Sequence, residues 1–181
     1  MSMNQNKPLR TPDEYHKVRE QIGPKLAKVI FVFESPPKSG LYFYDEGGKT
    51  TEPLFAAMMK YVLDIKPNEK REGLLEFSKK GFLLIDATYV PVNYDEYKES
   101  ERNKKIMDDF PNLVRTLRKH SDQSTRLILV KSNICNLLDK RLTNAGFNVA
   151  NQGRVLPFPS NGNQKRFGQM VRELITTVHN T

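Results

Sequence analysis

Short apolar runs, each followed directly by a polar loop, are the feature that most constrains the fold of this chain. Residues 28–33, 81–87 and 126–130 are rich in β-branched and large aliphatic side chains and have the length of strands covered on both faces. Between them, apolar residues recur every three or four positions, as in residues 51–63 and 110–117. Strands that alternate with amphipathic helices predict a parallel sheet with helices on both faces.

Weaker signals extend this pattern toward both ends of the chain. Thr11-Pro12-Asp13-Glu14 is typical of a helix start, and this helix is expected to end near residues 22–24. Ser132 is the expected cap of a helix that stops at residues 144–146, and residues 147–150 form a short fourth strand. A final helix places one apolar stripe inward: Phe167, Met170, Val171, Leu174, Ile175 and Val178. The charged residues 66–72 are expected to form a loop.

The predicted fold is therefore an α/β three-layer sandwich with a central, mostly parallel sheet of four to five strands. Residues 11–181 form a single domain, and residues 1–10 a flexible N-terminal segment. The 181 residues suffice for one core, and no apolar run is long enough to cross a bilayer. The polar N-terminus does not have the form of a signal peptide, so we expect a cytoplasmic protein, without membrane association and monomeric.

Charge and cysteine content narrow the function classes. A formal charge of +8 and a pI near 9.5 favour polyanionic partners such as nucleic acid, although an ordinary solvated surface has the same composition. Cys135 is the sole cysteine, which excludes disulfides and multi-cysteine metal sites, and its apolar helical neighbours indicate a buried structural thiol. His16, His120 and His179 lie outside the strand-end loops, so no metal site, cofactor or Ser-His-Asp triad is expected.

Ligands of parallel sheets bind outside the carboxyl ends of the strands. Polar loops leave the predicted strand ends after Phe33, after Ile85 and after Val155-Leu156. The loop at residues 35–40 lacks the glycine spacing of a phosphate-binding loop, and no Gly-x-Gly-x-x-Gly follows a strand. Phosphate-loop and ordinary dinucleotide-binding enzymes are therefore excluded.

Two carboxylates, Glu34 and Asp86, stand at the ends of buried strands. Such groups can orient or deprotonate water and stabilise a developing cation, which is the chemistry of hydrolysis at a sugar anomeric carbon. Each could instead cap a turn or pair with a lysine. Tyr42, Phe43 and Tyr44 follow the proline loop and could stack on a base or simply pack against that loop.

The order of these motifs resembles the uracil-DNA glycosylase superfamily over residues 28–178. Phe33-Glu34-Ser35-Pro36-Pro37 is similar to the first motif, in its Glu-x-Pro variant, which supplies the water-activating region. Ile85-Asp86-Ala87-Thr88 is similar to the strand end that usually presents an asparagine to the base. Leu156-Pro157-Phe158-Pro159-Ser160-Asn161 is similar to the leaving-group loop, which is commonly His-Pro-Ser.

The resemblance implies a DNA glycosylase for base-excision repair, which hydrolyses the N-glycosidic bond of a flipped damaged or deaminated base. It makes Glu34 and Asp86 the expected catalytic residues. The implied substrate-binding residues are Ser35, Pro36, Pro37, Tyr42, Phe43, Thr88, Phe158, Pro159, Ser160, Asn161 and Gly162. Backbone N–H groups around Ser160 to Gly162 would help to stabilise the leaving group. Lys38, Asn163, Lys165 and Arg166 are implied contacts to the DNA, and Asn163 and Gln164 the implied groove-inserting residues.

Two departures from the family pattern leave two alternatives to a DNA glycosylase open. Phe158 replaces the histidine that stabilises the departing base and cannot donate a hydrogen bond, and Asp86 replaces an asparagine. A noncatalytic nucleic-acid or nucleotide binder that retains the fold is the first alternative. A pocket for a small metabolite or a different glycosidic substrate is the second.

Overall fold

The computed structural model describes residues 9–92 and 96–176. A four-stranded, all-parallel sheet with the order β2-β1-β3-β4 forms the centre. Its strands are β1 (Val29–Phe33), β2 (Phe82–Asp86), β3 (Arg126–Leu129) and β4 (Asn148–Val149). The helical elements are α1 (Pro12–Ile22), α2 (Pro53–Met58), the π-helical η1 (Met59–Leu63), α3 (Lys70–Lys79), α4 (Glu99–Asp108), α5 (Phe110–His120), α6 (Ser132–Asn144) and α7 (Gln164–Thr176).

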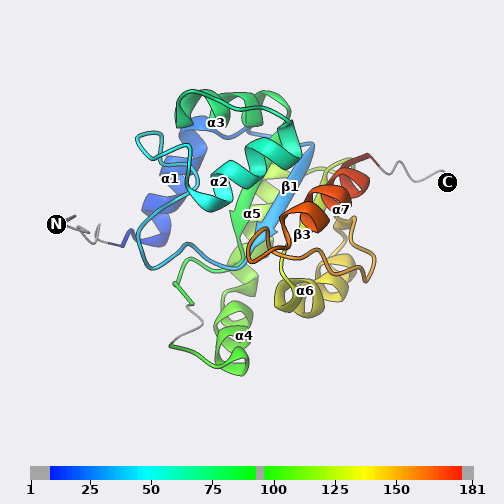
Figure 1. The fold of residues 1–181 in the computed structure, drawn as a ribbon. Coiled ribbons are helices and arrows are strands. Elements are labelled where there is room, and N and C mark those ends of the chain that lie inside the picture. Colours follow the sequence, from blue (N-terminus) through cyan, green and yellow to red (C-terminus); the bar gives the residue numbers. More distant parts are fainter. Residues whose placement is uncertain (1–8, 93–95, 177–181) are drawn as a thin grey trace.

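The connections place helices on both faces of the sheet. The chain runs from β1 outward to β2, then crosses back past β1 to β3 and β4. Connections between parallel strands are right-handed. The connection from β1 to β2 and the connections toward β3 and β4 run in opposite directions across the sheet, so their helices lie on opposite faces. Figure 1 shows α2 and α7 on the viewer's side of the sheet, and α7 packs against η1 there. The α/β class and the parallel sheet predicted from the sequence are confirmed.

The core lies around β1, which has neighbours on both sides. All five residues of β1 are buried, and so are all five of β2. The register pairs Phe33 with Asp86 and Val32 with both Ile85 and Leu129, so the carboxyl ends of the three strands lie at one edge. Cys135 is buried beneath this sheet, where its thiol donates to the Leu129 carbonyl at 3.3 Å and burial raises its pKa to about 11. The prediction of a structural thiol is confirmed.

Several local predictions needed correction. The charged loop expected over residues 66–72 contains the start of α3, and α4 was not predicted. Ser132 is the first residue of α6 rather than its cap, a position that Lys131 occupies. The helix from Pro53 ends at Met58 and continues as the π-helical η1, with Phe55, Met58 and Met59 buried.

Thr11 caps α1 as predicted, through a capping box with Glu14. Of the expected flexible segment, residues 1–8 lie outside the described ranges, as does Val178. Arg10 is held by an ion pair with Asp45 at 2.6 Å. None of the helices in residues 9–92 and 96–176 combines the length and apolar composition needed to cross a membrane.

Candidate functional site

A cleft of about 860 Å³ opens at the carboxyl ends of β1, β2 and β3. Segments that are more than 120 residues apart along the chain meet in its walls, because the parallel strands deliver their loops to one edge. Eleven of the residues predicted from the sequence line it: Glu34, Ser35, Pro36, Pro37, Tyr42, Phe43, Asp86, Phe158, Ser160, Asn161 and Asn163. The three predicted loops therefore do converge, but the third does not leave a strand end as expected, since β4 ends at Val149 and residues 155–156 are not in a strand.

Other predicted site residues lie outside the cleft lining. The hydroxyl of Thr88 donates to Asp109 at 2.6 Å, where it braces the junction between α4 and α5. Pro159 is buried, and Gly162 forms the exposed tip of its turn. Lys38 is on the surface in an ion pair with Glu96. Lys165 and Arg166 are exposed in the first turn of α7.

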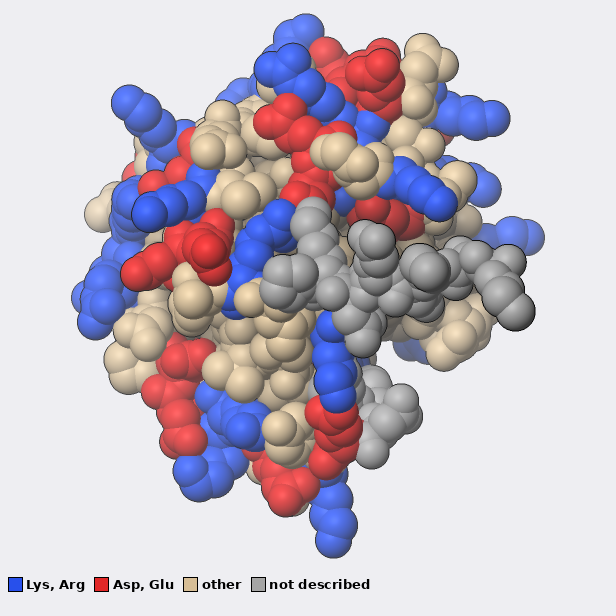
Figure 2. Space-filling view, turned by 90° about the vertical axis from the view of Figure 1, so that its left-hand side faces the viewer, with Lys and Arg blue, Asp and Glu red and all other residues tan. Residues whose placement is uncertain are grey.

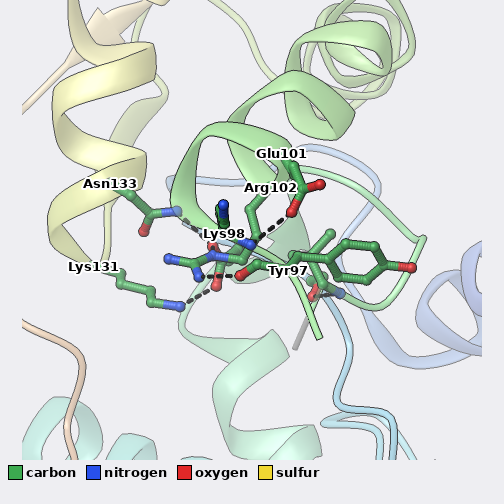
Figure 3. Close-up of polar contacts among 9 residues, drawn as sticks. Tyr97, Lys98, Glu101, Arg102, Lys131 and Asn133 are labelled. Carbon is green, nitrogen blue, oxygen red and sulfur yellow. Dashed lines mark hydrogen bonds and ion pairs between the residues drawn. The ribbon is translucent and has the colours of Figure 1, made fainter. Parts of the chain in front are cut away.

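Glu34 is the centre of a polar cluster, and Figure 3 labels its partners Arg102, Lys131 and Asn133. Its carboxylate binds the Lys131 ammonium through Oε2 and accepts a hydrogen bond from Asn133 Nδ2 through Oε1 at 2.5 Å. Arg102 Nε lies 3.4 Å from the same Oε1, and Arg102 Nη1 donates to the Tyr97 carbonyl at 3.1 Å. Figure 3 shows Arg102 reaching in from α4, and Lys131 and Asn133 from the start of α6. Glu34 is 8% exposed, so its charge is held mainly by these partners.

Lys131 lies at the topological switch point of the sheet. The loop after β1 leads toward β2 and the loop after β3 leads toward β4, so a crevice forms between β1 and β3. The ion pair between Glu34 and Lys131 spans this crevice. The backbone of Lys131 has φ 87° and ψ 140°, a region that glycine favours and that costs other residues about 1–3 kcal/mol. Strain of this kind concentrates at functional sites.

Lys131, Asn133 and Arg102 were not among the predicted site residues. Lys131 had a usable signal, since it directly follows the apolar run 126–130 just as Glu34 follows β1. Asn133 is two positions further into the same strand-to-helix turn. Arg102 had none, because it stands in a run of charged residues and only the packing of α4 shows that its side chain is buried.

Asp86, at the end of β2, is a buried carboxyl group in the lining of the cleft. Its side chain is 5% exposed, and in the described part of the chain no hydrogen bond to its carboxyl is formed. Burial raises the pKa of Asp86 to about 7, and the charge of Arg19 lowers it. A carboxyl group buried beside a cleft with a pKa near neutrality is typical of proton-transfer residues.

A polar cluster behind Asp86 sets its electrostatic surroundings. Arg19, from α1, is 1% exposed and donates through Nη1 to the Tyr89 hydroxyl at 2.6 Å. Within residues 9–92 and 96–176, Arg19 Nε and Nη2 have no hydrogen-bond partner. Burial raises the pKa of Tyr89 to about 12 and that of Tyr42 well above its usual range, so both phenols stay neutral. Arg19 is therefore the permanent positive charge that lowers the pKa of Asp86, against the effect of burial.

Aromatic side chains form much of the apolar wall. Phe43 is 6% exposed and contacts Tyr44, Phe55 and Phe77 with ring-centroid distances of 5.0, 5.9 and 5.3 Å. Tyr42 is 2% exposed, so both predicted stacking residues are packed in the core, although both are part of the cleft lining. Phe158 is half-buried and lies edge-on to Phe33, with centroids 5.9 Å apart.

The loop that precedes α7 closes in a tight turn. Asn161 and Gly162 have φ of 49° and 84°, and the Asn163 amide donates to the Ser160 carbonyl at 2.9 Å. The Ser160 amide donates to the Phe158 carbonyl at 2.8 Å. This amide is therefore engaged within the loop, which corrects the expectation that it would face a leaving group.

Glu52 is a third carboxylate in the cleft wall. It accepts a hydrogen bond from the buried Lys70 ammonium at 2.6 Å, and Lys70 also donates to the Tyr42 carbonyl at 2.7 Å. Glu52 is therefore a structural anchor for the loop at residues 42–52.

The chain matches no protein-family model, and no significant match appears among curated proteins or solved structures.

Proposed function

We propose that this protein is a DNA glycosylase with a fold like that of the uracil-DNA glycosylase superfamily, acting on a damaged or deaminated base flipped out of DNA. The observation that supports it is the meeting of Glu34, Asp86 and Ser160, from three distant segments, in one cleft. The cleft is within the size range of small-molecule sites and has mainly apolar walls with a few polar groups, which suits a flat heterocycle.

Asp86 is the residue best suited to activate water. In the proposed reaction the oxygen of a water bonds to C1′ of the sugar and the C1′–N bond breaks, with its electron pair leaving on the base. The carboxylate of Asp86 takes one proton from the attacking water, and solvent returns a proton to the base. A pKa of about 7 provides both an ionised fraction and adequate basicity at neutral pH.

Glu34 is proposed to act through its neighbours. Both of its oxygens accept hydrogen bonds from protein donors, so the carboxylate is directed at Lys131 and Asn133 and not at a water molecule. Its proposed role is to hold Lys131 and Asn133 at the end of β3, which fixes the shape of the cleft floor.

DNA is proposed to approach the rim formed by residues 160–166, where Lys165 and Arg166 are exposed beside the turn that lines the cleft. A different face appears in Figure 2, where Lys and Arg side chains alternate with Asp and Glu over the described surface. The formal charge of +8 is thus not gathered on that face.

A strand-scission assay tests the proposal. Purified protein is incubated with single-stranded and duplex oligonucleotides that carry uracil, hypoxanthine, xanthine or an alkylated base, and abasic sites are then cleaved with alkali. Product from the wild-type protein but not from the Asp86→Asn variant is expected. The absence of any product above that of a Glu34→Ala, Asp86→Ala double variant would falsify the proposal.

The second candidate is a noncatalytic nucleic-acid or nucleotide binder, favoured by the occupied oxygens of Glu34 and by Phe158 in place of a hydrogen-bond donor. Salt-dependent binding of an oligonucleotide, with no product in the scission assay, would support this candidate.

A further inference from the structure

We infer that the base taken by this cleft is an N-alkylated purine with a formal positive charge, such as 7-methylguanine, an inference that rests on the proposed glycosylase activity. Alkylation of a ring nitrogen places this charge on the base while it is still bonded to the sugar. Breaking the C1′–N bond then returns an electron pair to the ring and releases a neutral base. Such a substrate needs a cleft that accepts a cation, and it needs no donors that stabilise an anion.

The loop before α7 is poorly equipped to stabilise a departing anion, because that task needs hydrogen-bond donors fixed in advance. Phe158 lines the cleft, and its ring cannot donate a hydrogen bond. The amides of Ser160 and Asn163 donate to carbonyl groups of the same loop, at 2.8 and 2.9 Å. Uracil and hypoxanthine leave as anions and would lack these donors. A cationic purine leaves as a neutral molecule and would not need them.

The charged groups of the cleft favour a positively charged ligand. The described lining contains three carboxyl groups, from Glu34, Glu52 and Asp86, and one ammonium group, from Lys131. The ammonium of Lys131 lies against Glu34, in the ion pair that spans the crevice. A neutral ligand gains little from such walls, whereas a cation is attracted to them.

Asp86 is the carboxyl group that we place beside the charged ring. Its side chain is 5% exposed, so the ionised carboxylate has lost most of its water and gains strongly from a cation at hydrogen-bond distance. Burial raises the pKa of Asp86, and the charge of Arg19 opposes this effect from outside the cleft lining. A cationic base on the cleft side would lower the same pKa further. The substrate would thereby favour the ionised form of Asp86, which activates water.

The apolar walls suit the flat ring and its alkyl group. Five side chains in the lining offer apolar contact: Pro36, Pro37, Leu41, Leu54 and Phe158. Phe158 is half-buried, and an aromatic ring attracts a cation over its face more strongly than it attracts a neutral ring. The cleft volume of about 860 Å³ leaves room for a purine with an added alkyl group.

The proposed step balances without a proton donor for the base. The water oxygen bonds to C1′, the C1′–N bond breaks, and its electron pair neutralises the positive charge of the purine ring. The Asp86 carboxylate takes one proton from the water and passes it to solvent. The products are the neutral alkylated purine, an abasic sugar and one proton in solution.

A binding experiment tests the recognition of charge apart from catalysis. The cation 7,9-dimethyladeninium and the neutral 9-methyladenine are titrated separately into the protein in a calorimeter. Wild type should bind the cation about 10–100-fold more tightly, which is the worth of a hydrogen bond to a charged group. In Asp86→Asn this preference should largely disappear, because only the added methyl group and the aromatic contact still distinguish the two ligands. Glu99→Gln removes an exposed carboxylate outside the cleft lining and should keep the preference.

Base release separates the inference from the proposed activity. Single-turnover release of 7-methylguanine, hypoxanthine and uracil from otherwise identical duplexes is followed by chromatography of the free base, and spontaneous loss without protein is subtracted. Release of 7-methylguanine should be at least about 10-fold faster than release of either neutral base. Faster release of uracil or hypoxanthine, or a wild-type protein without preference for the adeninium cation, would overturn the inference while the glycosylase proposal stood. Release of no base from any lesion would overturn both.

Discussion

The ammonium of Lys131 binds the carboxylate of Glu34 across the crevice between β3 and β1, while the Lys131 backbone has the strained φ of 87°. This contact joins the two loops that leave the central strands in opposite directions. Because both loops also line the cleft, the ion pair sets the spacing of its floor. Stability and site geometry are thus coupled at one pair of residues.

Replacing Glu34 with glutamine should destabilise the fold strongly. The substitution removes the buried negative charge that Arg102 and Lys131 contact, and breaking a buried ion pair on one side costs about 3 kcal/mol or more in free energy of unfolding. Urea titration measures the effect. The matched control is Glu96→Gln, which breaks the exposed ion pair with Lys38 and should cost less than about 1 kcal/mol. Equal losses in the two variants would contradict the role of Glu34 as a buried anchor.

The backbone strain at Lys131 predicts an unusual order of stability for two variants at this position. Lys131→Gly and Lys131→Ala both lose the ion pair with Glu34, but only glycine adopts a φ of 87° without steric cost. We expect the glycine variant to be more stable than the alanine variant by about 1–2 kcal/mol, the reverse of the order at ordinary positions. Chemical unfolding of both variants under one set of conditions gives this difference. An alanine variant as stable as the glycine variant would show that the strain is absent in solution.

The strands and their loops could be predicted from the sequence because both faces of the sheet are covered. Such strands are continuous apolar runs, and each ends where polar residues begin, as at Phe33 and Glu34. Helices α3 and α4 were missed because their sequences are dominated by charged residues, and their inward faces contain Lys70 and Arg102. Periodicity of apolar residues is a weak signal for a helix in which a charged side chain occupies part of the buried face.

The carboxylates of the candidate site were predicted, but their partners were not. Glu34 and Asp86 can be recognised as candidate site residues from local sequence alone, because each stands at the end of an apolar run. Which carboxylate is paired depends on residues far along the chain, since Glu34 meets Asn133 across 99 positions whereas Asp86 meets no partner in the described segments. Only the parallel packing of β1 against β3 decides this difference.

The packing of α7 on η1 can be tested independently of any activity. A Cβ atom at Gly168 would lie 2.5 Å from Cδ1 of the Tyr61 ring, so Gly168→Ala should destabilise the protein by about 1–3 kcal/mol through overpacking. At Gly47 an added Cβ meets nothing within 4 Å, so Gly47→Ala is the control and should change stability by less than about 1 kcal/mol. Thermal unfolding separates the two. A neutral Gly168→Ala would place α7 further from Tyr61.

Asp86→Asn should stabilise the fold at alkaline pH. Burial raises the pKa of Asp86 from 3.8 to about 7, so the unfolded chain loses this proton first as the pH rises, and stability falls until the folded pKa is passed. Asparagine avoids this cost, and the expected gain is about 2–4 kcal/mol near pH 8, at 1.36 kcal/mol for each unit of pKa change. Near pH 5 the gain should be less than about half of that, because the folded carboxyl is then protonated. Urea titrations of both proteins at the two pH values give the comparison, and a gain that does not grow with pH would contradict a raised pKa.

The same proton should control the rate of base release. If ionised Asp86 accepts the proton of the attacking water, kcat/KM in the scission assay rises about tenfold per pH unit below pH 7 and levels off above it. Asp86→Asn should lower the rate at least about 100-fold and abolish this rise, because an amide cannot take the proton. The two effects separate function from folding, since the variant that loses activity is expected to gain stability. A rate that instead falls as the pH rises through 7 would mean that the neutral carboxyl is the active form, donating a hydrogen bond to the base, and would move Asp86 from water activation to base recognition.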